Sequence, residues 1–216
     1  MSDIHNMCIK KRLMFNNSAI MCSMQQTANR HLSQNTAGFA HPRRNIAALG
    51  VQNGMFVADF GAGSGAYTLA LAEHLQGSGR IYAIDVQRDL LRRIANEAVH
   101  RGYKNVEVIW GDLEVPRASK LADGSIDLVL ISNLLFQVPD KMPVLREARR
   151  IVKGTGHVAM IDWSESFGGM GPITEDVVRK GTALELSEKA GLSLVREFTT
   201  GAHHYGLLLK PVASKI

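Results

Sequence analysis

The sequence has few cysteines and no long apolar run. Only Cys8 and Cys22 occur in 216 residues, and their spacing matches neither a zinc site nor a disulfide framework. No uncharged apolar run reaches the ~18 residues that a transmembrane helix needs. We therefore expect two free thiols, a cytoplasmic protein, no bound metal ion and no transmembrane segment.

The body of the chain also lacks net charge. Residues 1–44 contain one acid, Asp3, and hold the whole excess behind the formal charge of +5. Basic and acidic side chains balance in residues 45–216. A nucleic-acid enzyme usually carries a basic stripe on its folded domain, so a small-molecule substrate is favoured and a nucleic acid is disfavoured.

The N-terminal segment, residues 1–40, shows no sustained hydrophobic period. We expect a variable segment there, either a lid or partly disordered, and Met21 and Met24 leave a later natural start open. A helix is expected from Pro42 to Leu49, with Gly50 as its left-handed cap. Residues 41–216 are expected to form one domain.

From residue 55 onward, short apolar runs alternate with amphipathic stretches. The apolar runs, typical of strands buried on both faces, lie at 55–60, 80–85, 106–110, 126–132 and 157–161. The stretches that predict helices lie at 66–75, 88–100 and 141–152. Repeated strand–helix alternation predicts right-handed βαβ units and a parallel sheet.

The end of the chain departs from this rhythm. After a predicted helix at 174–190 come two apolar runs, 192–198 and 203–210, separated by residues 199–202 alone. So short a loop permits an antiparallel hairpin but no parallel crossover. The predicted fold class is α/β: a Rossmann-like three-layer α/β/α sandwich, whose mostly parallel seven-stranded sheet ends in an antiparallel hairpin.

The strongest local signal is the glycine-rich stretch VADFGAGSGA at 57–66. Glycines at alternate positions let a backbone turn sharply and approach a ligand closely. The stretch also satisfies a loose dinucleotide fingerprint, with Asp85 about 20 residues further on. However, Asp59 would place a carboxylate near a pyrophosphate, whereas it suits the ammonium and positive sulfur of a sulfonium cofactor. S-adenosylmethionine is therefore favoured over a nicotinamide dinucleotide, and the terminal hairpin points the same way.

From Val51 to Pro211 the chain resembles the class I S-adenosylmethionine-dependent methyltransferases, most closely the branch with the ubiquinone/menaquinone-biosynthesis C-methyltransferases. The resemblance rests on VADFGAGSG (57–65), IYAIDV (81–86), WGDLE (110–114), DLVLISNLLFQV (127–138), LREARRIVKGTGHVAMIDW (145–163) and HHYGLLLKP (203–211). It implies methyl transfer to a quinone precursor or another small aromatic or organic compound. The sequence departs from the family mainly before His41, which leaves the closest subfamily and the acceptor open.

The resemblance also implies a set of cofactor-binding residues: Asp59, Gly61, Gly63, Gly65, Asp85, Val86, Asp112, Leu113, Ser132 and Asn133. The glycines would line the methionine part, and Asp59 would reach its ammonium directly or through water. Asp85 would accept both ribose hydroxyls in charge-assisted bonds. Asp112 and Leu113 would bracket the adenine, while Ser132 and Asn133 would face the sulfonium and the acceptor.

No catalytic residue can be assigned from the sequence. An acceptor that is a carbon or oxygen acid requires a base, and the candidates are Asp162, His203 and His204, with His157 and Glu165 beside them. Asp162 follows the fifth predicted strand at the ligand end, so it is the best placed. Alternation along a strand sends the adjacent histidines to opposite faces, so at most one of them is expected to reach the cleft.

A glycine-rich loop at residues 164–172 admits two interpretations, a mobile flap with apolar contacts or a plain surface loop. Three other functions also stay open. The chain could be an RNA methyltransferase using its basic N-terminal segment, a dehydrogenase, or an S-adenosylmethionine-binding protein without catalysis. The sequence leaves the oligomeric state undetermined.

Overall fold

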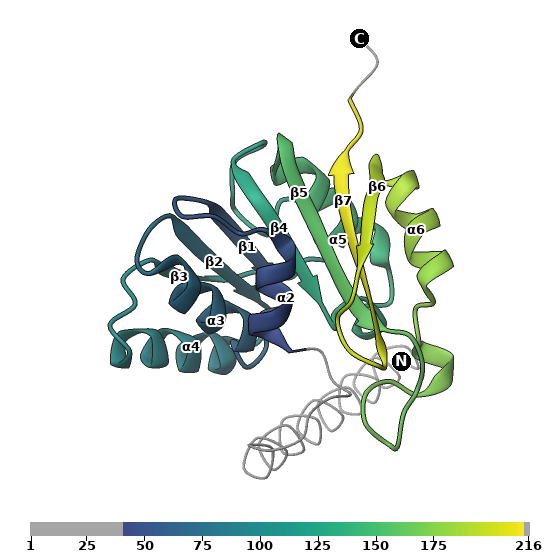
Figure 1. The fold of residues 1–216 in the computed structure, drawn as a ribbon, viewed down its shortest axis with the longest axis horizontal. Helices are drawn as coiled ribbons and strands as arrows, with labels where there is room; N and C mark the ends of the chain where they lie inside the picture. The colour runs from purple at the N-terminus through teal and green to yellow at the C-terminus, as the bar shows by residue number, and fades with distance from the viewer. Residues whose placement is uncertain (1–40, 214–216) are drawn as a thin grey trace, which may run out of the picture. The chain divides into compact units, whose positions relative to one another are not determined.

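The computed structural model describes residues 41–213 (Figure 1). The predicted variable segment at residues 1–40, both cysteines and the alternative start residues therefore lie outside the described part of the chain. The expectations for them stay predictions.

A seven-stranded sheet forms the middle layer, in the order β3-β2-β1-β4-β5-β7-β6. Its strands are β1 (Phe56–Phe60), β2 (Arg80–Asp85), β3 (Val106–Trp110), β4 (Ile126–Ser132), β5 (Val152–Trp163), β6 (Leu192–Phe198) and β7 (His204–Pro211). The pairs among β1 to β5 are parallel, whereas β7 runs antiparallel to both β5 and β6. The predicted parallel sheet with a terminal hairpin is confirmed.

Helices cover both faces of this sheet. They are α2 (Pro42–Leu49), α3 (Ala66–Leu75), α4 (Arg88–His100), α5 (Lys141–Ile151) and α6 (Lys180–Lys189), with short 3-10 turns η1 (Leu135–Gln137) and η2 (Thr174–Asp176). Successive side chains along each strand point to opposite faces of the sheet, so the core has two parts, one on each face. Val57 and Leu130 pack with α2 and α3, whereas Ala58 and Val129 pack with α5 and α6. Burial on both faces thus accounts for the largely apolar runs of the inner strands.

The strand β5 is longer than its apolar run indicated. The prediction covered residues 157–161, but pairing begins at Val152, which lies opposite Ile126. A register shift between Ile126 and Leu128 accommodates the polar residues that follow Val152. His157, expected to open this strand, therefore lies within it, opposite Leu128.

The helix predicted at residues 174–190 is wrong over residues 174–179. The turn η2 ends at Asp176, and α6 begins only at Lys180, after Arg179 in an extended conformation (ψ 147°). The Tyr205 hydroxyl donates to the carbonyl of the buried Val178 at 3.0 Å. This tertiary bond uses a carbonyl that a continuous helix would need for itself, and the chain stays extended there.

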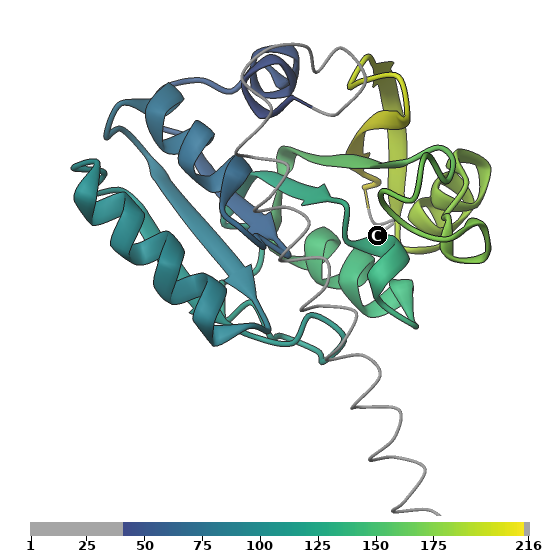
Figure 2. The same ribbon diagram turned by 90° about the horizontal axis from the view of Figure 1, so that it is seen from below.

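The parallel strands all end at one edge of the sheet, and β7 starts at the same edge. It is the lower edge in Figure 1, and Figure 2 looks onto it from below. Ligands of open α/β sheets bind outside the carboxyl ends of the strands, where the strand order reverses. In this sheet the reversal lies between β1 and β4.

Candidate functional site

The glycine loop after β1 forms a close-fitting cradle. Gly61, Gly63 and Gly65 all have positive φ, at 69°, 53° and 81°. A Cβ on Gly61 would lie 2.8 Å from Leu134 Cδ1, and one on Gly65 would lie 2.7 Å from Ile94 Cγ1. The loop is thus packed between the turn after β4 and helix α4, and glycine alone fits this space without strain.

Asp85, at the end of β2, is bound to this loop. Its Oδ2 accepts from the Gly63 amide and its Oδ1 from the Gln87 amide, both at 2.8 Å. The side chain is buried. An ionised carboxylate has about four acceptor positions, so each oxygen keeps capacity for one more donor. The arrangement suits a ligand with two adjacent hydroxyls, such as a ribose.

Asp59 lies beneath the loop and is only 2% exposed. The Thr68 hydroxyl donates to its Oδ2 at 2.6 Å. Burial raises the pKa of Asp59 to about 6, against the lowering effect of Thr68, and the neighbouring Asp85 charge raises it further. A cationic group beside Asp59 would favour its ionised form.

The ends of β2 and β3 bring a second group of predicted residues together. Asp112 is exposed and its Oδ1 accepts from the Glu114 amide at 3.0 Å, while Leu113 is buried. Sequence reasoning did not single out Trp110, which pairs in register with Asp85. Its Nε1 donates to the Val86 carbonyl at 3.0 Å. The one sign of Trp110 in the sequence was an aromatic residue two positions before the predicted site residue Asp112.

The turn after β4 leaves a buried polar atom unsatisfied. Asn133 has a positive φ of 53°, and its amide donates to the Ile161 carbonyl at 2.8 Å. Its Oδ1 is buried and has no hydrogen-bond partner within residues 41–213. Such an atom costs ~1–3 kcal/mol, so it indicates a place for a polar ligand.

Ser132 lies next to a polar pair that the sequence did not reveal, and its own Oγ is buried with no hydrogen-bond partner within residues 41–213. It lies beside the Tyr67 hydroxyl on α3, which accepts from Asn45 Nδ2 on α2 at 2.7 Å. Burial raises the pKa of Tyr67, so this phenol stays protonated near neutral pH. The bond between Asn45 and Tyr67 joins α2 to α3 next to the end of β4. No spacing in the sequence relates these three residues.

Asp162, the best-placed base by sequence, is 1% exposed and bound to the main chain through both oxygens. Its Oδ1 accepts from the Trp163 amide at 2.8 Å, and its Oδ2 accepts from the Leu135 amide at 3.0 Å. Burial raises its pKa to about 7, although these two bonds lower it. Asp162 thus connects the end of β5 to η1 and has a structural role in this geometry.

The two adjacent histidines have different surroundings. His204 is 8% exposed, and its ring lies 4.3 Å from that of Trp163. Burial lowers the pKa of His204 to about 4. His203 Nδ1 instead lies 2.8 Å from Glu165 Oε1, and its ring stacks on Phe167 at 3.6 Å. The structure thus pairs two candidates that are 38 residues apart.

The loop at residues 164–172 packs against the end of β5, from which it starts. Phe167 and Met170 form an isolated β-bridge, and a Cβ on Gly171 would lie 2.5 Å from the Trp163 ring. Phe167 and Met170 are nevertheless 40% and 39% exposed. The loop therefore presents apolar side chains at the carboxyl edge of β5.

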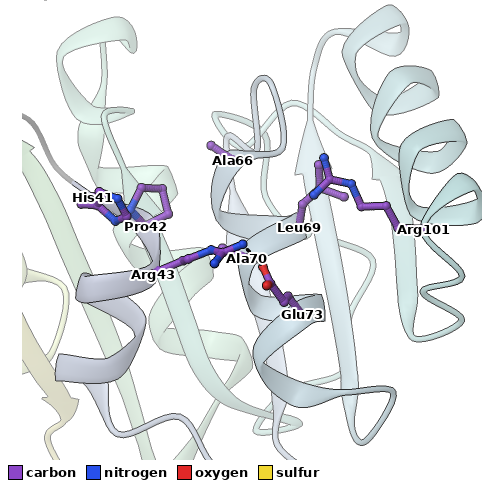
Figure 3. A pocket seen from close by; sticks show the side chains of 8 residues that line it. All are labelled: His41, Pro42, Arg43, Ala66, Leu69, Ala70, Glu73 and Arg101. Atoms are coloured by element: carbon purple, nitrogen blue, oxygen red, sulfur yellow. Dashed lines mark ion pairs between the residues drawn. The ribbon is translucent and has the colours of Figure 1, made fainter. Parts of the chain in front are cut away.

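A cavity of about 250 Å³ lies apart from these residues (Figure 3). It is lined by His41, Pro42, Arg43, Ala66, Leu69, Ala70, Glu73 and Arg101. Arg43 and Glu73 form an ion pair across it at 2.7 Å, drawn as a dashed line in the figure. None of the predicted cofactor residues lines this cavity, although Ala66 directly follows the glycine loop.

Within residues 41–213, no group of three or more His, Cys, Asp or Glu side chains is placed to hold a metal ion. In the same range, no helix has the length and apolar character needed to cross a membrane.

Comparisons with known proteins identify the family of the chain. A family model described as a methyltransferase domain matches residues 52–198. A demethylmenaquinone methyltransferase of Bacillus velezensis is 34% identical over 128 residues, 58% of this chain and 53% of that protein. The corresponding enzyme of Anoxybacillus flavithermus is 32% identical over 118 residues, covering 54% and 48%. The chain thus spans about half the length of these relatives.

Solved structures share the fold. A SAM-dependent methyltransferase from Aquifex aeolicus superposes with a TM-score of 0.76 at 24% identity, covering 90% of this chain and 98% of that one. An arsenic(III) methyltransferase from Chlamydomonas reinhardtii gives 0.60 at 22% identity, covering 76% and 66%. The family model spans more than half of the sequence. The chain therefore belongs to the methyltransferase domain family and has the Rossmann-like fold of its S-adenosylmethionine-dependent members.

Proposed function

We propose that this protein transfers a methyl group from S-adenosylmethionine to a small organic acceptor with an aromatic ring, such as a quinone precursor. The observation that carries the proposal is the position of Asp85. Its carboxylate is fixed by the Gly63 and Gln87 amides beside a cradle that a Cβ would fill. The aromatic acceptor class is suggested by the relatives named demethylmenaquinone methyltransferases.

The residues fit the cofactor at both of its ends. Asp85 suits the ribose, Asp59 suits the ammonium, and the unsatisfied Asn133 Oδ1 lies at the end of β4. When bound, S-adenosylmethionine supplies a methyl group already activated by the sulfonium. The protein then has to bind and orient the two reactants and exclude water, and proximity alone can contribute several kcal/mol.

Calorimetric titration tests the proposed cofactor. We expect S-adenosylmethionine and S-adenosylhomocysteine to bind and NAD to give no heat, because the Asp59 carboxylate opposes a pyrophosphate at the glycine loop. Binding of NAD alone would favour the dehydrogenase alternative, and binding of none of the three would refute the proposal. Transfer of a labelled methyl group to a small aromatic acceptor would exclude a purely non-catalytic binding role.

Cofactor affinity should depend on pH through Asp59. Its pKa of about 6 lies above the ordinary 3.8, so the ligand-free protein holds it protonated below pH 6. The cofactor's amine stays protonated over this range and prefers the ionised carboxylate. We expect the Kd for S-adenosylhomocysteine to rise about tenfold from pH 7 to pH 5, as the competent fraction falls.

The matched variant for this measurement is Asp59→Asn, whose side chain does not titrate. Its Kd should be weaker and nearly constant between pH 5 and pH 7. A wild-type Kd that is equal at both pH values would show that Asp59 does not contact the ammonium.

An RNA substrate has less support. Arg43, one of the basic residues behind that alternative, pairs with Glu73 on α3, and most of the others lie outside residues 41–213. We infer that the acceptor is a small molecule. Salt-dependent RNA binding of micromolar or tighter affinity would contradict this, because phosphate contacts make binding strongly dependent on salt.

A further inference from the structure

The strand order separates the cofactor from the acceptor along the carboxyl edge. Asp112 follows β3 and Asp85 ends β2, so the adenosine half of the cofactor belongs at these strands. The glycine loop follows β1 and Asn133 follows β4, which places the methionine half there. In-line transfer needs the nucleophile and the sulfur on opposite sides of the methyl carbon. The acceptor therefore belongs beyond β4, at β5 and at the start of β7.

Among residues 41–213, the candidate bases on that side are Asp162, His204 and the pair formed by His203 and Glu165, and the first two are poorly suited to take a proton. Asp162 is buried, with both oxygens bound to main-chain amides. His204 is buried against Trp163, where burial lowers its pKa to about 4. The pair formed by His203 and Glu165 remains.

The surroundings of His203 hold its ring in one orientation. A carboxylate can only accept hydrogen bonds, so the contact with Glu165 at 2.8 Å requires the hydrogen on Nδ1. The lone pair of the neutral ring then lies on Nε2. Phe167 stacks on the ring with an interplanar angle of 20°. The Ser164 amide donates to the His203 carbonyl at 2.9 Å, so the loop after β5 fixes both the backbone and the side chain.

The position of His203 suits an aromatic acceptor. Neighbouring strands lie ~4.8 Å apart, and β7 is the second strand beyond β4. His203 is thus ~10 Å along the edge from the turn that contains Asn133. A fused two-ring aromatic compound has a similar length. The stacked Phe167, 40% exposed, offers such a ring an apolar surface beside the base.

We propose that His203 is the catalytic base that takes the hydroxyl proton of the aromatic acceptor, with Glu165 as its positioning residue. This inference rests on the proposed function and assigns its proton transfer to a residue. The acceptor O–H bond breaks, its electron pair stays on oxygen, and the proton forms a bond with Nε2. The imidazolium is stabilised by the Glu165 carboxylate and later releases the proton to water.

The test uses 4-nitrocatechol, an aromatic diol whose absorption spectrum changes when it ionises. The full-length protein, saturated with S-adenosylhomocysteine, is titrated with this probe at a pH below the probe's own ionisation. We expect the wild type to bind the probe as the anion. His203→Gln should bind it as the neutral diol, with the ionised fraction at least about tenfold lower, and Glu165→Gln should give an intermediate value.

The control is His100→Gln, an exposed change at the end of α4, which should match the wild type. Titration with S-adenosylhomocysteine and a thermal melt verify that each variant is folded with an intact cofactor site. An anionic probe in His203→Gln, or no bound probe in the wild type, overturns the assignment of His203 while leaving the cofactor site intact. Failure of the wild type to bind S-adenosylhomocysteine overturns the proposed function as well.

Discussion

Replacing Asp85 with alanine is expected to weaken S-adenosylmethionine binding about 100-fold. The carboxylate is proposed to accept both ribose hydroxyls, and hydrogen bonds to charged groups contribute ~1.5–3 kcal/mol each. A loss of ~2.7 kcal/mol corresponds to a hundredfold change in Kd. The Gly63 and Gln87 amides also lose their acceptor, which loosens the cradle itself. Calorimetry with both adenosyl ligands measures the effect.

The matched control is Asp89→Ala. Asp89 lies four residues further along, at the start of α4, with its side chain 75% exposed, and it pairs with Arg92 on the same helix. This substitution removes the same charge close to the site, yet the affinity should stay within about twofold of the wild type, because exposed ion pairs contribute little. Equal affinities for the wild type and Asp85→Ala would refute the assignment of Asp85 to the ribose.

The second large effect is expected from Gly65→Ala, measured as the free energy of unfolding in urea. Gly65 has φ +81°, and the added Cβ would meet Ile94 Cγ1 at 2.7 Å. Ile94 is itself buried, with Leu91 and Ala83 around it, and has little room to move. The left-handed conformation costs an alanine ~1–2 kcal/mol, and overpacking adds ~1–3 kcal/mol. We expect a destabilisation of about 2–5 kcal/mol.

Gly102→Ala separates the two contributions. Gly102 has a similar φ of +74°, but nothing lies within 4 Å of an added Cβ. It should therefore show the conformational cost alone, ~1–2 kcal/mol. The double variant Gly65→Ala with Ile94→Ala should be less destabilised than the sum of its two single variants, since contacting residues couple. If the two single variants are equally destabilised, the loop is not packed against α4 as described.

Periodic burial explains why so much of the fold could be predicted from the sequence. The bounds of β2, β3, β4, α3 and α4 coincide with the predicted ranges. The inner strands β2 and β4 are buried over most of their length and read as largely apolar runs, whereas the edge strand β3 is only half-buried. The short connection before β7 likewise required an antiparallel pair. The prediction failed at α6, where the Tyr205 hydroxyl binds the Val178 carbonyl from a distant strand.

The site residues also divide into those that the sequence predicts and those that depend on tertiary contacts. The sequence by itself determined the family, the glycine cradle and the carboxylates at the strand ends, because these depend on spacing within one strand–loop–helix unit. Only the tertiary structure paired His203 with Glu165, bound both oxygens of Asp162 to the main chain and left Asn133 Oδ1 unsatisfied. The physical reason is that hydrophobic periodicity records which face of an element is buried. It carries no information on which side chains from distant strands meet across the edge of the sheet.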